Sequence, residues 1–310
     1  MITLRGLTKR FGGTTAVDAL TVDIGPGQVT GFLGPNGAGK STTMRMILGL
    51  DRPSAGQALV RGRPYRELRR PLHEVGALLD ARAVHPARSG RAHLLAMARS
   101  NGIPGRRVDE VLAVVGLDDR AAAKPGRTLS LGMGQRLGIA GALLGDPPVL
   151  MFDEPVNGLD PDGVRWVRQL MRSLADEGRT VFVSSHLMTE MQLTADRLVV
   201  IGRGRLLADA PIDEVIAGSA VAVRVRSPQP AGLVALTERL TAAGAAVEPA
   251  GPDELTVTGA TVERIGDVAY ELGVRLHELS PHGASLEQAF MELTADSVEY
   301  AGAPTRNEAR

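Results

Sequence analysis

The stretch GPNGAGKST, residues 34–42, constrains this chain more than any other part of its sequence. It has the spacing G-x-x-x-x-G-K-[ST], in which glycines let successive backbone N–H groups turn inward around a phosphate. The apolar residues 28–33 before it predict a buried strand, and residues 40–50 predict a helix. A strand, a glycine-rich loop and a helix in this order bind phosphate at the helix N-terminus. We therefore expect a P-loop nucleotide site.

The residue types in this loop indicate separate roles. Lys40 is one of only three lysines, with Lys9 and Lys124, among 35 basic residues. Its compact charge fits inside a tight loop, where we expect it to neutralise the β- and γ-phosphates of ATP. The Ser41 hydroxyl is expected to bind Mg²⁺. The predicted ATP contacts in the loop are Gly34, Pro35, Asn36, Gly37, Ala38, Gly39, Lys40, Ser41 and Thr42.

Two acids follow a second apolar run. Residues 149–155, VLMFDEP, are typical of a central parallel strand, and they end in Asp153 and Glu154. Ligands bind at the carboxyl ends of such strands. We expect Asp153 to hold Mg²⁺ through a water and Glu154 to polarise the water that attacks the γ-phosphate; the alternative is an acidic turn that only caps the strand. The next predicted strand, 180–186, ends in His186, which either reaches the γ-phosphate or is an ordinary polar side chain.

A second glycine-rich segment, TLSLGMGQRLGIA, occupies residues 128–140. It places Ser130 and Gly132 at the start of a predicted helix, whose dipole favours anions there. One nucleotide site does not need two such loops. Taken alone, Ser130 can be no more than a helix N-cap.

The motifs GPNGAGKST, LSLGMGQR, VLMFDEP, NGLD and SSH, in this order and spacing, resemble those of the ATP-binding subunits of ABC transporters over residues 1–217. In that family two copies stack head to tail, and the signature loop of one copy closes over the ATP held by the other. The resemblance implies that Ser130, Gly132 and Met133 contact ATP bound by a partner copy. The second loop would then serve a different site from the first.

Other residues take their expected roles from the same resemblance. Phe11 would lie against adenine, and Asp160 of NGLD would be a dimer-facing acid. Asp80 occupies the place of the Q-loop glutamine, where an acid can still bind a metal but cannot donate an amide hydrogen bond. The signature reads LSLGM rather than LSGGQ, because Leu131 replaces a glycine and Met133 a glutamine.

These departures and an extra C-terminal module resemble the type-2 exporters of the daunorubicin- and bacitracin-resistance kind. The resemblance implies an ATPase, with ATP and Mg²⁺ as cofactors, that forms a homodimer and drives a separate integral-membrane permease to export a drug, antibiotic, lipid or similar cargo. Such a subunit is peripheral, at the cytoplasmic face of the plasma membrane. The alternatives are an importer ATPase, a soluble ABC ATPase acting on ribosomes or DNA, and a regulatory module without turnover, against which Glu154 and His186 argue.

Composition excludes several other classes. The sequence has no cysteine, which excludes disulfides and thiolate metal sites, and its formal net charge of zero gives no reason to expect a nucleic-acid partner. Its longest apolar stretches are too short to span a bilayer. Strands that alternate with helices predict an α/β fold. We expect a RecA-like P-loop NTPase core over 1–217, with an antiparallel β arm (1–27 and 56–63) and a helical subdomain over about 84–145.

A smaller second domain is expected over residues 218–300. Its pattern predicts a strand at 221–226, a helix at 232–243, two short strands, a helix at 261–272 and a strand at 274–280. The order β-α-β-β-α-β is typical of an α+β ferredoxin-like module. We expect this domain to stabilise the dimer or to contact partners, and the tail 301–310 to be disordered.

Overall fold

The computed structural model describes residues 1–81, 83–217, 222–282 and 285–295. The chain forms two compact units, and each is described here by itself. One comprises Met1–Ile212 with residues 293–295, and the other comprises Asp213–Glu292. The boundary between these compact units lies at Ile212, near the expected domain boundary at 217. The expected tail 301–310 lies outside the described residues.

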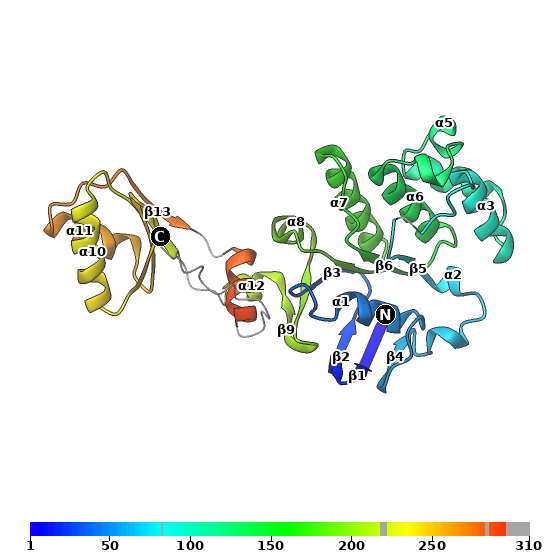
Figure 1. Cartoon of the computed structure of the whole chain (residues 1–310), viewed down its shortest axis with the longest axis horizontal. Coiled ribbons are helices and arrows are strands. Elements are labelled where there is room, and N and C mark those ends of the chain that lie inside the picture. Colours follow the sequence, from blue (N-terminus) through cyan, green and yellow to red (C-terminus); the bar gives the residue numbers. More distant parts are fainter. Residues whose placement is uncertain (82, 218–221, 283–284, 296–310) are drawn as a thin grey trace, which may run out of the picture. The chain divides into compact units, whose positions relative to one another are not determined.

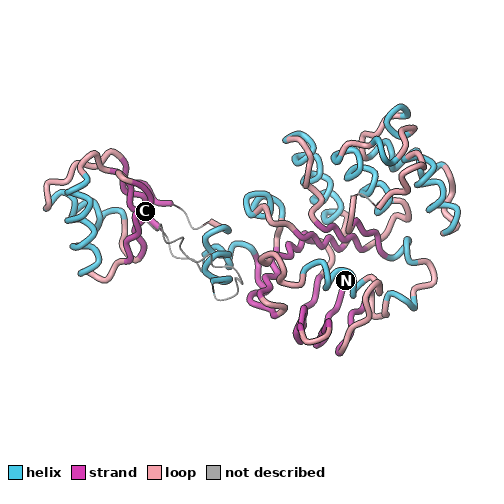
Figure 2. Tube along the Cα trace, viewed as in Figure 1, coloured by secondary structure: helices cyan, strands magenta, loops and turns pink. Residues whose placement is uncertain are grey.

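The first unit is built on a six-stranded sheet with the order β5-β6-β7-β3-β8-β9. Neighbouring strands are parallel, except that β9 runs antiparallel to β8. Figure 2 shows the strands in magenta. The three central strands β3, β6 and β7 are almost wholly buried, as their apolar runs predict. The strands are β3 (Gln28–Leu33), β5 (Val75–Leu78), β6 (Val149–Asp153), β7 (Thr180–Ser184), β8 (Arg197–Gly202) and β9 (Arg205–Pro211).

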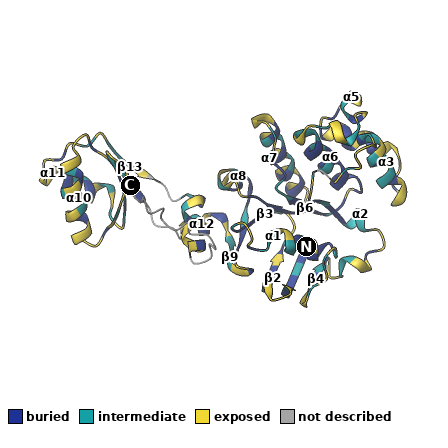
Figure 3. Ribbon diagram, in the orientation of Figure 1, coloured by how far each residue is buried: buried dark blue, intermediate teal, exposed yellow. Residues whose placement is uncertain are grey.

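Different elements cover the two faces of this sheet (Figure 1). Helices α6 (Leu131–Leu143) and α7 (Pro161–Asp176) lie over one face. Helix α1 (Lys40–Ile47) lies on the other, with a three-stranded antiparallel sheet of β1 (Ile2–Phe11), β2 (Thr14–Ile24) and β4 (Ala55–Val60). This sheet is the expected β arm, in which β4 is a single strand paired with β1. The buried core between the sheets (Figure 3) includes Ile2, Leu4, Phe32, Met151 and Phe182.

Helices fill most of the chain between β5 and β6. They are α3 (Gly90–Ser100), α4 (Arg106–Val114), α5 (Asp119–Ala122) and α6, and the hydroxyl of Ser89 and the carboxylate of Asp118 cap two of them. Among the described residues, no helix combines the length and the apolar character that crossing a membrane requires. The remaining short helices are α2 (Pro71–Glu74), α8 (Met188–Thr194), α9 (Ile212–Ala217) and α12 (Leu286–Thr294), with 3₁₀ turns at Tyr65–Glu67 and Gly126–Thr128.

The second unit contains a four-stranded antiparallel sheet with the order β11-β12-β10-β13. The order of its elements is the β-α-β-β-α-β order of a ferredoxin-like fold. Its own apolar core includes Val223, Leu236, Leu255, Val257 and Ile265. The elements are β10 (Ala222–Arg226), α10 (Pro230–Ala242), β11 (Ala246–Gly251), β12 (Glu254–Thr258), α11 (Val262–Glu271) and β13 (Glu278–His282).

The last strand of this unit differs from the prediction. A strand is expected over 274–280, whereas β13 begins at Glu278. The backbone before it is bound to the loop that precedes α10. The Arg275 amide donates to the side chain of Gln229 over 3.0 Å, and the Ser227 hydroxyl donates to the Arg275 carbonyl over 2.8 Å. These bonds occupy the polar groups that a strand would pair, so the ladder begins later.

Leu236→Ala tests whether the second unit is held by its own core. Leu236 is wholly buried on α10, and truncating such a side chain costs about 2–5 kcal/mol. We expect the calorimetric unfolding transition of this unit to move to lower temperature, while the first unit still binds ATP. Val234→Ala, at a position 59% exposed on the same helix, is the control and should move it little. Loss of ATP binding in Leu236→Ala would contradict this independence.

Candidate nucleotide-binding and hydrolysis site

The glycine-rich loop joins the end of β3 to the start of α1, as its motif requires. Gly37 and Gly39 have φ values of 83° and 102°, which L side chains rarely adopt. A Cβ atom on Gly39 would also lie 2.4 Å from the carbonyl oxygen of Ala16. The loop borders a pocket of about 400 Å³ whose lining residues are Ala16, Asn36, Gly37, Ala38, Gly39, Lys40, Ser41, Thr42, Leu79, Asp153 and Glu154.

Lys40 lies across the loop. Its ammonium group donates to the carbonyl oxygens of Gly34 and Pro35. Burial lowers the pKa of Lys40, and the carboxylates of Glu154 and Asp153 oppose this effect. A polyphosphate in the pocket would add negative charge and so stabilise the charged ammonium.

Asp153 ends β6 and is hydrogen-bonded through both carboxylate oxygens. One accepts from the Ser41 hydroxyl over 2.8 Å, and the other accepts from the Ser184 hydroxyl. Ser184 is wholly buried at the end of β7, which lies between β6 and β3 in the sheet. A carboxylate beside a hydroxyl suits Mg²⁺, which uses few protein ligands and completes its shell with phosphates and water. The described residues contain no cluster of three potential His or carboxylate ligands.

Glu154 follows β6 with an unusual backbone. Its φ of 51° lies in the left-handed region, which is unfavourable for a residue other than glycine. Its N–H is close to both the carbonyl and the hydroxyl oxygen of Ser184, at 3.2 Å from each. Its carboxylate lies 2.8 Å from Nδ1 of His186. The structure thus brings these two predicted catalytic side chains together, at the edge where Asp153 and the loop also lie.

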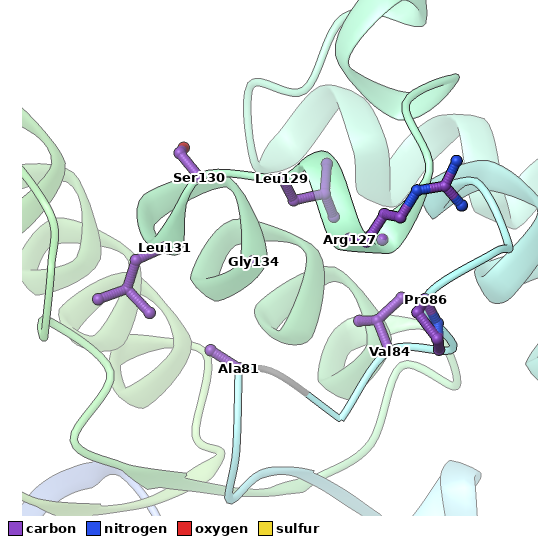
Figure 4. Close-up of a pocket in the computed structure, with 9 residues that line it drawn as sticks. Ala81, Val84, Pro86, Arg127, Leu129, Ser130, Leu131 and Gly134 are labelled. Atoms are coloured by element: carbon purple, nitrogen blue, oxygen red, sulfur yellow. The ribbon is translucent and has the colours of Figure 1, made fainter.

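The second glycine-rich segment lies at another pocket. Ser130 caps α6, and its hydroxyl accepts from the Met133 amide over 3.2 Å. Neither of these residues, nor Gly132, lines the P-loop pocket. Ser130 instead borders a pocket of about 370 Å³ with Ala81 and other residues of the neighbouring loops, and its side chain points away from Ala81 (Figure 4). The signature segment therefore does not complete the P-loop pocket of its own chain.

Other predicted residues also lie outside the lining of the P-loop pocket, namely Gly34, Pro35, His186, Phe11, Asp160 and Asp80. Phe11 is 51% exposed, with the Lys9 ammonium 4.8 Å from its ring centre. Asp160 is exposed and caps α7 by accepting from the Gly163 amide over 2.8 Å. Asp80 borders a separate pocket of about 450 Å³, whereas its neighbour Leu79 reaches the P-loop pocket.

Two contributors to the site were missed from the sequence. Ser184 is the first residue of the motif SSH, from which only His186 is predicted as a site residue, although a hydroxyl at the end of the strand predicted to follow the acids is a usable signal. Gln135 donates from α6 to the carbonyl oxygens of Glu154 and Asn157. Its position in a helix gives no hint of these backbone partners.

A phosphate-binding loop with Asp153, Glu154 and His186 at adjacent strand ends defines a P-loop nucleotide-hydrolysing domain. Residues 17–157 match the family model of the ABC transporter, and residues 221–287 match a domain of unknown function, DUF8746. The chain is 36% identical over 307 residues to the uncharacterized ABC transporter ATP-binding protein YhcH of Bacillus subtilis (strain 168), covering 96% of this chain and 97% of that protein. It therefore belongs to the ATP-binding proteins of ABC transporters, and it is an ATPase.

Two further relatives agree with this assignment. The bacitracin transport ATP-binding protein BcrA of Bacillus licheniformis is 41% identical over 212 residues, which cover 67% of this chain and 69% of that protein. The solved structure of cbiO1 from Clostridium perfringens, part of the ABC transporter complex cbiONQ, has a TM-score of 0.60 and 30% identity. That match covers 70% of this chain and 90% of the other.

Ser184→Ala tests whether the hydroxyl on β7 supports Asp153. Losing a hydrogen bond to a metal-binding carboxylate typically costs about 10–100-fold. We therefore expect a fall of about this size in ATPase kcat and a higher Mg²⁺ concentration for half-maximal rate. Ser185→Ala is the matched control, because Ser185 is equally buried but its hydroxyl accepts from the Leu187 amide. Mg²⁺ titrations of the ATPase rate compare the two. Equal effects of both substitutions would refute the role of Ser184.

Proposed function

We propose that this protein is the ATP-hydrolysing subunit of an exporter, which dimerises and drives a separate membrane permease. The observation that carries the proposal is that the P-loop pocket and the signature segment occupy different places in one chain. ATP bound by one copy can then meet the signature segment of a second copy. In this arrangement ATP joins the two subunits, and its hydrolysis releases them.

Each residue at the strand ends has a role in this proposal. Ser41 binds Mg²⁺, and Asp153 holds the ion through a water. The 2.8 Å hydrogen bond between the two side chains supports these roles, because it places their oxygens side by side. Lys40 neutralises the β- and γ-phosphates. Glu154 accepts the proton of the attacking water. His186 holds the Glu154 carboxylate in place and contacts the γ-phosphate. The reaction transfers a phosphoryl group to water, mainly through positioning and charge neutralisation.

The partner copy supplies the remaining contacts. Ser130, Gly132 and Met133 approach the γ-phosphate in trans, from the N-terminus of a thirteen-residue helix.

Asp160 faces the partner, and the exposed ring of Phe11 is available to stack on adenine. Asp80 adds a metal or water contact when the dimer closes.

Export is favoured over the other transport and non-transport roles. The bacitracin transport protein BcrA is a relative over 67% of this chain. The departures at Leu131, Met133 and Asp80 fit an exporter ATPase better than an importer ATPase. The cargo class is a drug, antibiotic, lipid or similar molecule, and its contacts lie on the permease.

The protein is a peripheral subunit that binds the permease at the cytoplasmic face of the plasma membrane. Residues 1–217 form the nucleotide-binding domain, in which the loop near Asp80 and the helical region 84–127 meet the permease. Residues 218–300 form an accessory domain that stabilises the dimer or contacts partners. No nucleic acid takes part.

Glu154→Gln tests the assignment of the base. The variant keeps the shape of the side chain but cannot accept the proton, so we expect kcat to fall about 10²–10⁴-fold with ATP binding retained. Size-exclusion chromatography with light scattering should show a monomer that becomes a dimer when ATP is added. Glu177→Gln, an acid paired with Arg179 at the end of α7, is the control and should behave as the unmodified protein. Hydrolysis by Glu154→Gln at the unmodified rate would mean that another group is the base.

A further inference from the structure

Gln135 is a buried polar side chain in the middle of an apolar helix. It is 5% exposed on α6, where its neighbours Leu137 and Ile139 belong to the core. Its amide nitrogen donates to the carbonyl oxygen of Glu154 over 3.1 Å and to that of Asn157 over 3.3 Å. Its own carbonyl oxygen has no hydrogen-bond partner within the part of the chain that the structure describes. Within the described residues, the amide of Gln135 thus contributes its donors alone.

The two acceptors of Gln135 lie in the segment that needs to be held. Glu154 has a left-handed backbone, with φ at 51°, and such conformations persist only where the surroundings enforce them. Ser184 holds the Glu154 N–H from the β7 side. Gln135 holds the Glu154 carbonyl from the α6 side. The peptide groups on either side of the Glu154 Cα are thus fixed by different elements, and together they fix the direction of its carboxylate.

Helix α6 also carries the signature segment at its N-terminal end, close to Gln135. Ser130 caps the helix, and the side chain of Leu131 lies against Gly158, where a Cβ would come within 2.2 Å of it. Gly132 comes close to the same loop, because a Cβ there would lie 3.3 Å from the Gly158 carbonyl oxygen. The start of α6 and the loop after Glu154 are therefore in tight contact. A shift of the helix relative to this loop must change the hydrogen bonds of Gln135.

We propose that Gln135 is a positioning residue that couples the signature segment to the base of the same chain. When Ser130 engages the γ-phosphate of the partner's ATP, α6 is fixed, and Gln135 holds the backbone of Glu154 in its active geometry. Each site then hydrolyses ATP efficiently only when the opposite site is occupied. This inference rests on the proposed roles of Ser130 and Glu154.

Gln135→Met is the test, because methionine has a similar length and no donor. We expect kcat of the full-length protein to fall at least about tenfold, as for other lost positioning contacts. The affinity for ATP, measured by equilibrium dialysis, should stay within about twofold, because Gln135 does not line the P-loop pocket. Leu137→Met is the control, since it changes an equally buried residue of the same helix without touching Glu154, and its kcat should be nearly unchanged. Should Gln135→Met not fold, Gln135→Asn, which withdraws the donor by one methylene, carries the same test.

A double substitution separates this inference from the proposed function. If Gln135 acts through Glu154, then Gln135→Met combined with Glu154→Gln should hydrolyse ATP no more slowly than Glu154→Gln alone. A further large loss in the double variant, or kcat of Gln135→Met near that of the unmodified protein, would overturn the positioning role. A parallel loss of ATP affinity would also overturn it and indicate a purely structural residue. Full activity of Glu154→Gln would instead overturn the assignment of the base.

Discussion

The carboxylate of Asp153 is the group on which the nucleotide site depends. Its oxygens accept from Ser41 at the start of α1 and from Ser184 at the end of β7, so one side chain joins the P-loop helix to two strands. The strand order β6-β7-β3 makes this possible, because the carboxyl ends of parallel strands meet at one edge. An acid at the end of a buried strand is costly unless donors or a cation compensate it. The site supplies two donors, the hydroxyls of Ser41 and Ser184.

Much of this edge could be predicted because its strands are buried on both faces. Continuous apolar runs identify β3 and β6, and the motifs at their ends identify Lys40, Asp153 and Glu154. The short strand β5 was missed, because four residues carry little periodic signal and their pairing with β6 depends on tertiary contacts. Ser184 and Gln135 were missed for a related reason. Asp153, the partner of Ser184, lies 31 residues away in the sequence, and Glu154, a partner of Gln135, lies 19 residues away. Gln135 binds only backbone atoms, and a sequence pattern does not show which backbone atoms a side chain binds.

A single chain contains the P-loop half of one proposed ATP site and the signature half of another. The P-loop pocket and the signature segment are both well formed, yet Ser130 borders a pocket apart from Lys40. In the proposed dimer these halves meet across the interface, and α6 links them within each chain through Ser130 at its start and Gln135 further along. Such a link would couple ATP hydrolysis at one site to ATP binding at the other. The dimer would then close as one unit against the permease, rather than at each site independently.

Mixing two inactive variants tests the shared site most directly. Lys40→Ala removes the phosphate contact, and Ser130→Arg blocks the signature segment, so each homodimer should be nearly inactive. In a mixed dimer, the intact P-loop of one chain faces the intact signature segment of the other. A 1:1 mixture should therefore regain ATPase activity. The rate should stay below the level of about a quarter of the unmodified rate that independent sites would give, because the Glu154 that acts at the intact site lies in the chain whose signature segment is blocked. A mixture that forms dimers but only adds the two residual rates would contradict a site built from two chains.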